Sequence, residues 1–342
     1  MAVGEAVKKG ILKAQPGYQI DVLSVSDGGE GFLTSLNQNS DFEINTLDEG
    51  KDLLLRDAKF QYGILNNHIY LESALSCGIE LLEREELDPT KTTSYGLGLG
   101  IKKLIGLGYT RFTLGLGGSA TNDGGAGLLA GLGFRFFNAQ DEEFIPSGGN
   151  LNEIKKILPS TIDFSQVKFT LATDVNNLLL GENGATYTFG KQKGGTDLEF
   201  LEKGMKHFAS FFTNQHNMQV GSGAAGGIGY SLMNIIQTQV KPGAQVLYEA
   251  LDLLETLPQY DLIISGEGKI DNQTNQGKWV DFISKICHEL QKDLVLICGT
   301  SKLKTYLNYP ILKIRSIEPD LQLAQKNATE LLEELAFNYF SR

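Results

Sequence analysis

The chain has 342 residues, enough for one large or two medium-sized domains, and its 41% hydrophobic and 21% charged residues are ordinary for a folded protein. A formal net charge of −11 argues against nucleic acid as a partner, because its phosphates would meet a repelling surface. No apolar run is long enough to cross a bilayer, and the three cysteines show no metal-ligand spacing. We therefore expect a cytoplasmic protein without a membrane or nucleic-acid partner.

The first half of the chain predicts helices alternating with short apolar strands. Val3, Val7 and Ile11 lie on one face of a helix that is already under way where the sequence starts, and Ile20–Val25 is predicted to be a strand. A helix is expected from Glu30 to about Leu36. Further elements are predicted as two strands within 53–71 around a turn at 66–67, a helix at 93–107, a strand at 111–116 and a helix at 124–132.

The second half continues this alternation, with predicted strands at 169–172, 261–265 and 294–298 and a last helix that carries Leu331, Leu332 and Leu335 on one face. Such alternation predicts an α/β fold with a mostly parallel sheet. We expect two domains, with the active site in the cleft between them. The expected Rossmann-like domain comprises 1–50, 90–132 and 240–342, and the inserted α/β domain comprises 51–89 and 133–239.

Four loops carry acidic residues, three of them together with glycine, and each follows an apolar run. They are SDGGEG (26–31), GLGGSATNDGG (115–125), DVNN (174–177) and SGEGKID (265–271). Glycine lets backbone N–H groups approach a phosphate, whereas a carboxylate in the same loop would repel it unless a hard cation lay between them. Ligands of parallel α/β sheets bind beyond the carboxyl ends of the strands. The pattern therefore predicts a shared site for phosphate and magnesium.

Several of these motifs have a second interpretation. Asp27 and Glu30 are spaced as a helix capping box, although the glycines around them favour a turn that contacts a ligand. The run 221–229 (GSGAAGGIG) is either a second phosphate cradle or a site of close helix packing. Glu267 and Asp271 are otherwise solvated loop charges. Lys191 and Lys193 are expected at the surface unless the second domain folds over the cleft.

Two familiar nucleotide motifs do not account for the chain. Residues 115–120 match the Gly-x-Gly-x-x-Ala dinucleotide fingerprint, but Arg135 stands where an acidic residue is required about twenty positions later. A Walker A loop does not occur in the sequence, so a kinase with this chain would not be a P-loop enzyme.

The chain resembles the bacterial glycerate kinases of the type I family from its first residue nearly to its last. The stretches that carry the resemblance are SDGGEGF, TTSYG, GLGGSATNDGGAG, ATDVNN, FGKQKGG, GSGAAGGIGY and ISGEGKIDNQT. The resemblance implies a two-domain α/β kinase that uses ATP and Mg²⁺ to phosphorylate D-glycerate, usually to 2-phosphoglycerate.

One departure from the family pattern concerns the N-terminus. Family members open with a strand and an Asp-Ser-Phe-Lys-Gly loop, and neither is present in this sequence. The alternative expectation is therefore an N-terminally truncated, catalytically impaired remnant that binds nucleotide; a misplaced start would explain the same observation.

The resemblance and the loop pattern together assign roles to individual residues. The expected catalytic acids are Asp27, Glu30, Asp123 and Asp174, of which Asp123 and Asp174 would hold magnesium. The expected ATP contacts are Gly115, Gly117, Gly118, Ser119, Asn122, Gly226 and Gly227. The expected substrate contacts are Lys193, Glu267 and Asp271. Either Asp27 or Glu30 would orient or deprotonate the glycerate hydroxyl. A homodimer is left open.

Overall fold

The computed structural model describes residues 2–26, 28–213, 215–271 and 279–341. It divides into two compact units, each described by itself below. The first unit comprises residues 1–27, 38–40 and 244–342, and the second unit comprises 28–37 and 41–243. The second unit is thus an insertion in the first.

Within its described residues, the second unit contains a six-stranded sheet in the order β1-β2-β3-β4-β8-β9. Its strands are β1 (Glu43–Lys51), β2 (Asp57–Leu65), β3 (His68–Glu72), β4 (Arg111–Gly115), β8 (Lys168–Ala172) and β9 (Gln237–Lys241). Strands β3, β4, β8 and β9 run parallel, whereas β1, β2 and β3 pair antiparallel. The carboxyl ends of four parallel strands therefore share one edge of this sheet.

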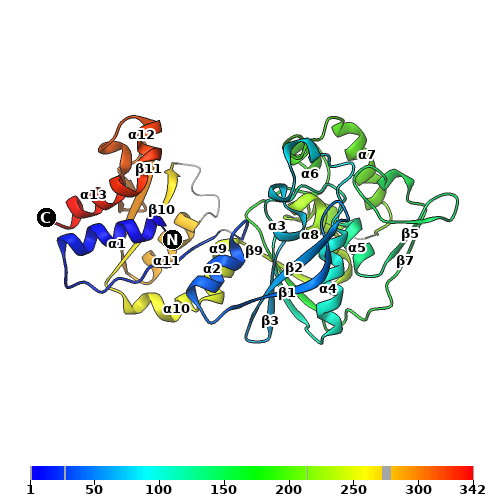
Figure 1. Ribbon diagram of the computed structural model, residues 1–342, viewed down its shortest axis with the longest axis horizontal. Helices are drawn as coiled ribbons and strands as arrows, with labels where there is room; N and C mark the ends of the chain where they lie inside the picture. Colours follow the sequence, from blue (N-terminus) through cyan, green and yellow to red (C-terminus); the bar gives the residue numbers. More distant parts are fainter. Residues whose placement is uncertain (1, 27, 214, 272–278, 342) are drawn as a thin grey trace. The chain divides into compact units, whose positions relative to one another are not determined.

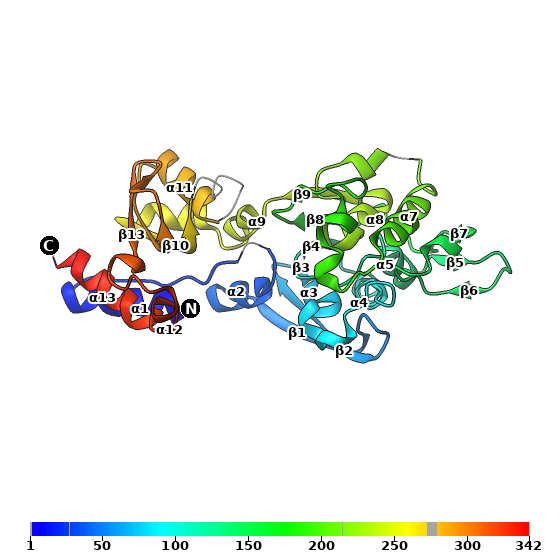
Figure 2. The ribbon, with the colours of Figure 1, turned by 90° about the horizontal axis from the view of Figure 1, so that it is seen from above.

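Helices cover both faces of this sheet. They are α2 (Phe32–Asn39), α3 (Ala74–Cys77), α4 (Tyr95–Gly106), α5 (Ala126–Gly131), α6 (Ala185–Phe189), α7 (Leu198–Ala209) and α8 (Ile228–Ile235). Figure 2 shows β3, β4, β8 and β9 in a row with α5 and α8 on one side and α2 on the other. A small sheet in the order β6-β5-β7 consists of β5 (Arg135–Phe137), β6 (Glu143–Phe144) and β7 (Lys156–Leu158). One continuous apolar core joins the main sheet to α4, α5 and α8.

The first unit is a second, smaller α/β layer structure (Figure 1). Its described sheet has the order β10-β11-β13-β12, formed by β10 (Leu262–Ile270), β11 (Asp293–Ser301), β13 (Tyr309–Lys313) and β12 (Thr305–Tyr306). Its helices are α1 (Ala2–Ala14), α9 (Gly243–Ala250), α10 (Leu253–Thr256), α11 (Trp279–Glu289), α12 (Leu321–Lys326) and α13 (Ala328–Phe340). Along β11, Leu296 and Cys298 pack into one apolar cluster and Ile297 into another, so both faces of the strand are buried.

Most predicted elements are confirmed, among them the first and last helices and the strands at β4, β8, β10 and β11. The strand predicted at Ile20–Val25 is wrong, because this extended segment belongs to no sheet among the described residues. Its side chains instead line an apolar cavity of about 670 Å³ beside β10. Strand β1 was not predicted, because its sequence EINTLDEGK lacks an apolar alternation.

The predicted α/β class with two domains is confirmed, but the division of the chain differs from the prediction. Residues 28–37, 41–50, 90–132 and 240–243 belong to the second unit, not to the unit that contains the two ends of the chain. The reason is β4, which is hydrogen-bonded between β3 and β8 and so cannot leave their sheet.

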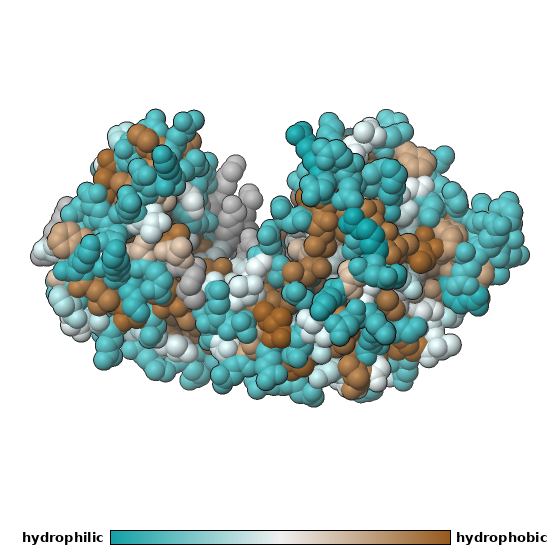
Figure 3. All heavy atoms as spheres, in the orientation of Figure 1, coloured by the Kyte–Doolittle hydropathy of each residue, from teal (hydrophilic) through white to brown (hydrophobic). Residues whose placement is uncertain are grey.

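The surface view of the molecule mixes hydrophilic areas with smaller hydrophobic ones (Figure 3). None of the helices in the described part of the chain has the length and apolar character needed to span a membrane.

Helix α4 offers a matched test of packing in the second unit. A Cβ at Gly98 would overlap the carbonyl oxygen of Leu128 in α5, whereas a Cβ at Gly106 would meet nothing within 4 Å. We expect Gly98→Ala to lower the free energy of unfolding by about 2–3 kcal/mol through overpacking. Gly106→Ala is expected to leave it unchanged or raise it by up to about 1 kcal/mol. Urea denaturation of both variants measures the difference, and equal stabilities would contradict the packing described here.

Candidate functional site

Three glycine-containing segments meet in backbone contact at the carboxyl ends of β4 and β8. A Cβ at Gly117 would lie 2.7 Å from the Cα atom of Gly29, and a Cβ at Gly115 would overlap the carbonyl oxygen of Gly28. A Cβ at Gly28 would lie 3.0 Å from the Cα atom of Gly243, which follows β9. The structure therefore brings the loops at 28–31 and 115–125 together, and no larger residue would permit this approach.

The outer part of the 115–125 loop offers a run of backbone donors. The amides of residues 117–119 have no acceptor among the described residues, whereas the flanking amides of Leu116 and Ala120 donate to the carbonyls of Ala172 and Cys77. The loop is thus fixed at both ends of this run. Successive amides that point outward from a turn form a concave site for an anion.

The backbone at this run has the conformation that such a turn requires. Gly118 is exposed and has φ = +65°, in the left-handed region. The carbonyl of Gly118 accepts from the Ile79 amide at 2.8 Å, and the carbonyl of Gly117 accepts from the Ser73 hydroxyl at 3.1 Å. Because the C=O and N–H of a trans peptide point in opposite directions, the amides of Gly118 and Ser119 point away from Ser73 and Ile79.

Asp123 lies inside the second unit with no exposed surface. Its Oδ2 accepts from the amide and hydroxyl of Ser94, both at 2.7 Å, and from the Gly127 amide at 3.2 Å, while Oδ1 accepts from the Gly125 amide at 3.0 Å. Burial raises the pKa of the carboxyl, and these four donors oppose the rise. Asp123 therefore anchors its loop, and the structure does not present it to a solvent-borne magnesium ion.

Lys193 and Asn122 also lie behind the loop. The expectation of a surface position for Lys193 is wrong, because the residue is only 3% exposed. Its Nζ donates to the Thr121 carbonyl at 2.7 Å and to the Ser119 hydroxyl at 3.2 Å. Asn122 is fully buried, and its Nδ2 donates to Thr186 Oγ1 at 3.2 Å. Both side chains face the protein interior.

The glycine run at 221–229 is a packing element. A Cβ at Gly226 would overlap the Thr121 carbonyl oxygen, and a Cβ at Gly227 would lie 2.5 Å from the Cα atom of Gly124. The Gly124 amide donates to the Gly226 carbonyl at 2.9 Å. Of the two interpretations of this run, the structure supports close packing, so Gly226 and Gly227 face the loop and not an open cradle.

Asp174 and Glu72 lie at the same edge of the sheet. Oδ1 of Asp174 accepts from the Gly243 amide at 3.0 Å. Glu72 ends β3, is 4% exposed and accepts from the amides of Gly31 and Leu33 at 2.9 and 3.2 Å. Sequence reasoning missed Glu72, because a single acid at the end of a strand carries no local signal.

Glu72 caps the start of helix α2. The helix begins at Phe32, so Glu30 precedes its first turn, and the Glu72 carboxylate accepts from the amides there. Glu30 is exposed, and its predicted pairing with Asp27 lies outside the described residues. Burial raises the pKa of Glu72, and the neighbouring Glu30 charge adds to this rise. Asp27 lies outside the described residues.

The remaining predicted site residues belong to the first unit. Glu267 lies in β10, and Asp271 follows it and pairs with Lys269 at 2.6 Å. In the part of the chain that the structure describes, no group of three or more His, Cys, Asp or Glu side chains is arranged to hold a metal ion. Cys77, Cys287 and Cys298 are free and buried.

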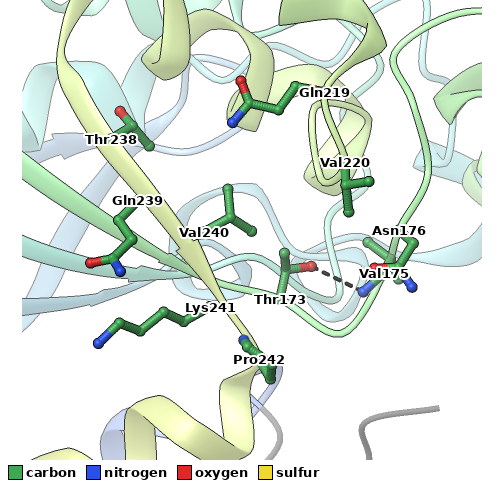
Figure 4. A pocket seen from close by; sticks show the side chains of 10 residues that line it. All are labelled: Thr173, Val175, Asn176, Gln219, Val220, Thr238, Gln239, Val240, Lys241 and Pro242. Atoms are coloured by element: carbon green, nitrogen blue, oxygen red, sulfur yellow. Dashed lines mark hydrogen bonds between the residues drawn. The ribbon is translucent and has the colours of Figure 1, made fainter.

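A cavity of about 480 Å³ lies along β9 and beside the loop that follows β8 (Figure 4). Thr173, Val175 and Asn176 line it from the loop that contains Asp174, Val240 lines it from β9, and Val220 lines it from the segment before the glycine run at 221–229. The volume falls within the range of small-molecule sites in proteins. Sequence analysis did not identify this cavity, because residues so far apart in the chain form it.

Comparison with known proteins places this architecture in a family. A sequence model of the glycerate kinase family matches residues 1–341. The chain belongs to the glycerate kinase family. Glycerate kinase of Haemophilus influenzae is 34% identical over 309 residues, which cover 87% of this chain and 82% of the relative. Glycerate 2-kinase of Escherichia coli K12 is 33% identical, with coverage of 87% and 81%.

The family assignment extends to the three-dimensional fold. A crystal structure assigned to glycerate kinase 2 of Salmonella typhimurium LT2 matches with a TM-score of 0.82 and 32% identity. The match covers 99% of this chain and 93% of the other. As a member of the glycerate kinase family, the chain is a kinase, and its two-unit α/β fold is that of a solved relative.

The anchoring role of Asp123 is testable by Asp123→Asn. The substitution keeps the size of the side chain but replaces one acceptor oxygen with an NH₂ group that faces backbone donors. We expect the free energy of unfolding to fall by about 2–4 kcal/mol, because buried donors lose their acceptor. Denaturation without any ligand is the measurement. Glu182→Gln, at an exposed acid of the same unit, is the control and is expected to shift stability by less than about 0.5 kcal/mol; similar effects of the two substitutions would contradict the anchor.

Proposed function

We propose that this kinase transfers the γ-phosphoryl group of ATP to D-glycerate, with 2-phosphoglycerate as the favoured product. The observation that carries the proposal is the run of amides at 117–119, which have no acceptor among the described residues and lie where two glycine loops touch. Relatives named glycerate kinase and glycerate 2-kinase support the acceptor substrate.

Within the predicted 115–119 stretch, the amides of residues 117–119 would bind the phosphates of ATP. Phosphoryl transfer depends mostly on positioning and on neutralising charge, and both tasks suit fixed backbone dipoles. Because Gly115 and Gly117 have no side chain, the loop at 28–31 can contact their backbone. Ser119 supplies the last amide of the run. Asn122, Gly226 and Gly227 would support this loop from within, since their contacts lie inside the unit.

Asp174 would hold the magnesium ion. Mg²⁺ is bound in kinases through one or two carboxylates together with phosphate oxygens and water, so a full protein cage is not required. Asp174 fits this role because its Oδ1 bond to Gly243 fixes the carboxylate at the edge where the glycine loops meet. When bound, the ion neutralises charge on the phosphates.

The remaining acids would act on glycerate. Asp27 or Glu30 would orient or deprotonate the attacking hydroxyl, and Glu30 is exposed. Glu267 and Asp271 of the first unit would hold substrate hydroxyls or metal-bound water. These roles belong to the proposal and rest on the family resemblance.

A second function, a nucleotide-binding remnant with impaired catalysis, is supported by one observation in the first unit. Strand β10 lies at the edge of its described sheet, beside the apolar cavity of about 670 Å³ lined by Val22, Leu23 and Ile264. Apolar surface left open beside a sheet edge lowers stability, and a kinase with a loosened first unit would bind nucleotide better than it turns it over.

Turnover distinguishes the two functions. We expect ADP release from ATP and Mg²⁺ to depend on added D-glycerate, and phosphorus NMR of the product to show the 2-phosphate ester. L-glycerate and ATP without an acceptor serve as controls. ATP binding without glycerate-dependent ADP release would favour the remnant, and a 3-phosphate product would refute the favoured regiochemistry.

The phosphate-binding role of the 117–119 amides is testable with a pair of substitutions at Gly118. Asp and Asn both tolerate positive φ and have nearly the same size, so Gly118→Asp and Gly118→Asn differ mainly in charge. We expect Gly118→Asp to raise the KM for ATP at least about tenfold more than Gly118→Asn, because its carboxylate repels the triphosphate. The KM for D-glycerate is expected to stay similar in the two variants, and equal KM values for ATP would refute the assignment.

A further inference from the structure

Lys193 has a position unlike that of its neighbour Lys191. Both belong to one 3₁₀ turn (Lys191–Lys193), but Lys191 is exposed and Lys193 is 3% exposed. Lys193 reaches residues more than seventy positions earlier in the chain, at Ser119 and Thr121. The ammonium group therefore contacts the loop that carries the 117–119 amides, within which Gly118 is exposed and Ser119 is buried.

The charged and titratable groups that face the Lys193 ammonium are the Asp123 carboxylate and the Cys77 thiol. Burial lowers the pKa of Lys193 to about 8, and the Asp123 charge opposes this shift. A buried ammonium is costly unless it is hydrogen-bonded and balanced by an opposite charge. The Thr121 carbonyl, the Ser119 hydroxyl and Asp123 supply this compensation from a single loop.

The backbone that carries Lys193 is itself held in place. Gly194 has φ = +89°, and a Cβ there would overlap the carbonyl oxygen of Leu87. The Gly195 amide donates to the Gly190 carbonyl at 2.8 Å, which closes the turn around Lys193. Because the base of the side chain is fixed, its two hydrogen bonds restrain the loop and not merely the lysine.

We propose that Lys193 is a positioning residue. Its ammonium group holds the 115–125 loop through the hydrogen bonds to Ser119 and Thr121, and so keeps the 117–119 amides in the geometry that binds the phosphates of ATP. The inference rests on the proposed function and replaces the direct substrate contact expected for Lys193. A glycine-rich loop is otherwise entropically costly to order, and ordering it before binding favours both affinity and orientation.

The test compares Lys193→Met with Lys191→Met. Methionine keeps the length of the apolar stem and removes the ammonium, and the second variant removes the same charge from an exposed site two residues away. We expect Lys193→Met to raise the KM for ATP about tenfold or more and to lower kcat, with the KM for D-glycerate within about twofold of the wild type. Lys191→Met is expected to leave all three within about twofold.

A second variant guards against a simple loss of folding. Ser119→Ala removes only the longer of the two hydrogen bonds and is expected to raise the KM for ATP in the same direction by about threefold to tenfold. All assays are made below the unfolding transition recorded by circular dichroism. If Lys193→Met and Ser119→Ala both lower the melting temperature but leave the KM for ATP unchanged, the positioning role is refuted and Lys193 has a structural role only.

The readouts separate this inference from the proposed function. If the wild type shows no glycerate-dependent ADP release, the proposed function is refuted but this inference is not. The inference is then tested by binding alone: the dissociation constant of a fluorescent ATP analogue is expected to rise about tenfold in Lys193→Met. An unchanged dissociation constant overturns the inference. A wild type that binds no ATP analogue overturns both.

Discussion

The architecture of the site depends on one constraint, which is that three backbone segments touch without side chains between them. Gly28, Gly115 and Gly117 lie so close to their neighbours that a single methyl group would force the segments apart. This contact joins the loop before α2 to the loop after β4 and to the start of α9. The carboxyl edge of the sheet therefore acts as one backbone surface, and the few side chains around it, such as Asp174, take positions that this surface determines.

Two buried charged side chains, Asp123 and Lys193, hold the 115–125 loop from the protein interior. Asp123 receives four hydrogen bonds and Lys193 donates two, and both act on residues 119–127. An isolated buried ion would be strongly unfavourable, but Lys193 donates to a carbonyl and a hydroxyl of the loop, and Asp123 accepts from two amides just after it in the chain and from the amide and hydroxyl of Ser94. The loop is thus polar on both sides: hydrogen bonds within the protein hold the inner side, and the outer amides stay available to a ligand.

Much of the fold was predictable from sequence, and the reason is periodicity. Strands such as β4 and β11 are apolar runs, and the apolar face of α13 recurs at helical spacing, so local pattern was sufficient. Strand β1 was missed because its exposure leaves no pattern. For the site, the glycine motifs correctly indicated segments that come together. The inner positions of Asp123 and Lys193 could not be predicted, since their partners Ser94 and Thr121 come from segments whose meeting depends on tertiary structure.

The contact between Gly28 and Gly243 has an evolutionary consequence. These residues stand at two points where the chain passes between the first and second units, and they are adjacent in space. A domain whose two ends touch can be accommodated within a host chain without stretching that host, as in naturally occurring domain insertions. The second unit thus begins and ends at neighbouring points, beside the glycine contacts at the carboxyl edge of its sheet.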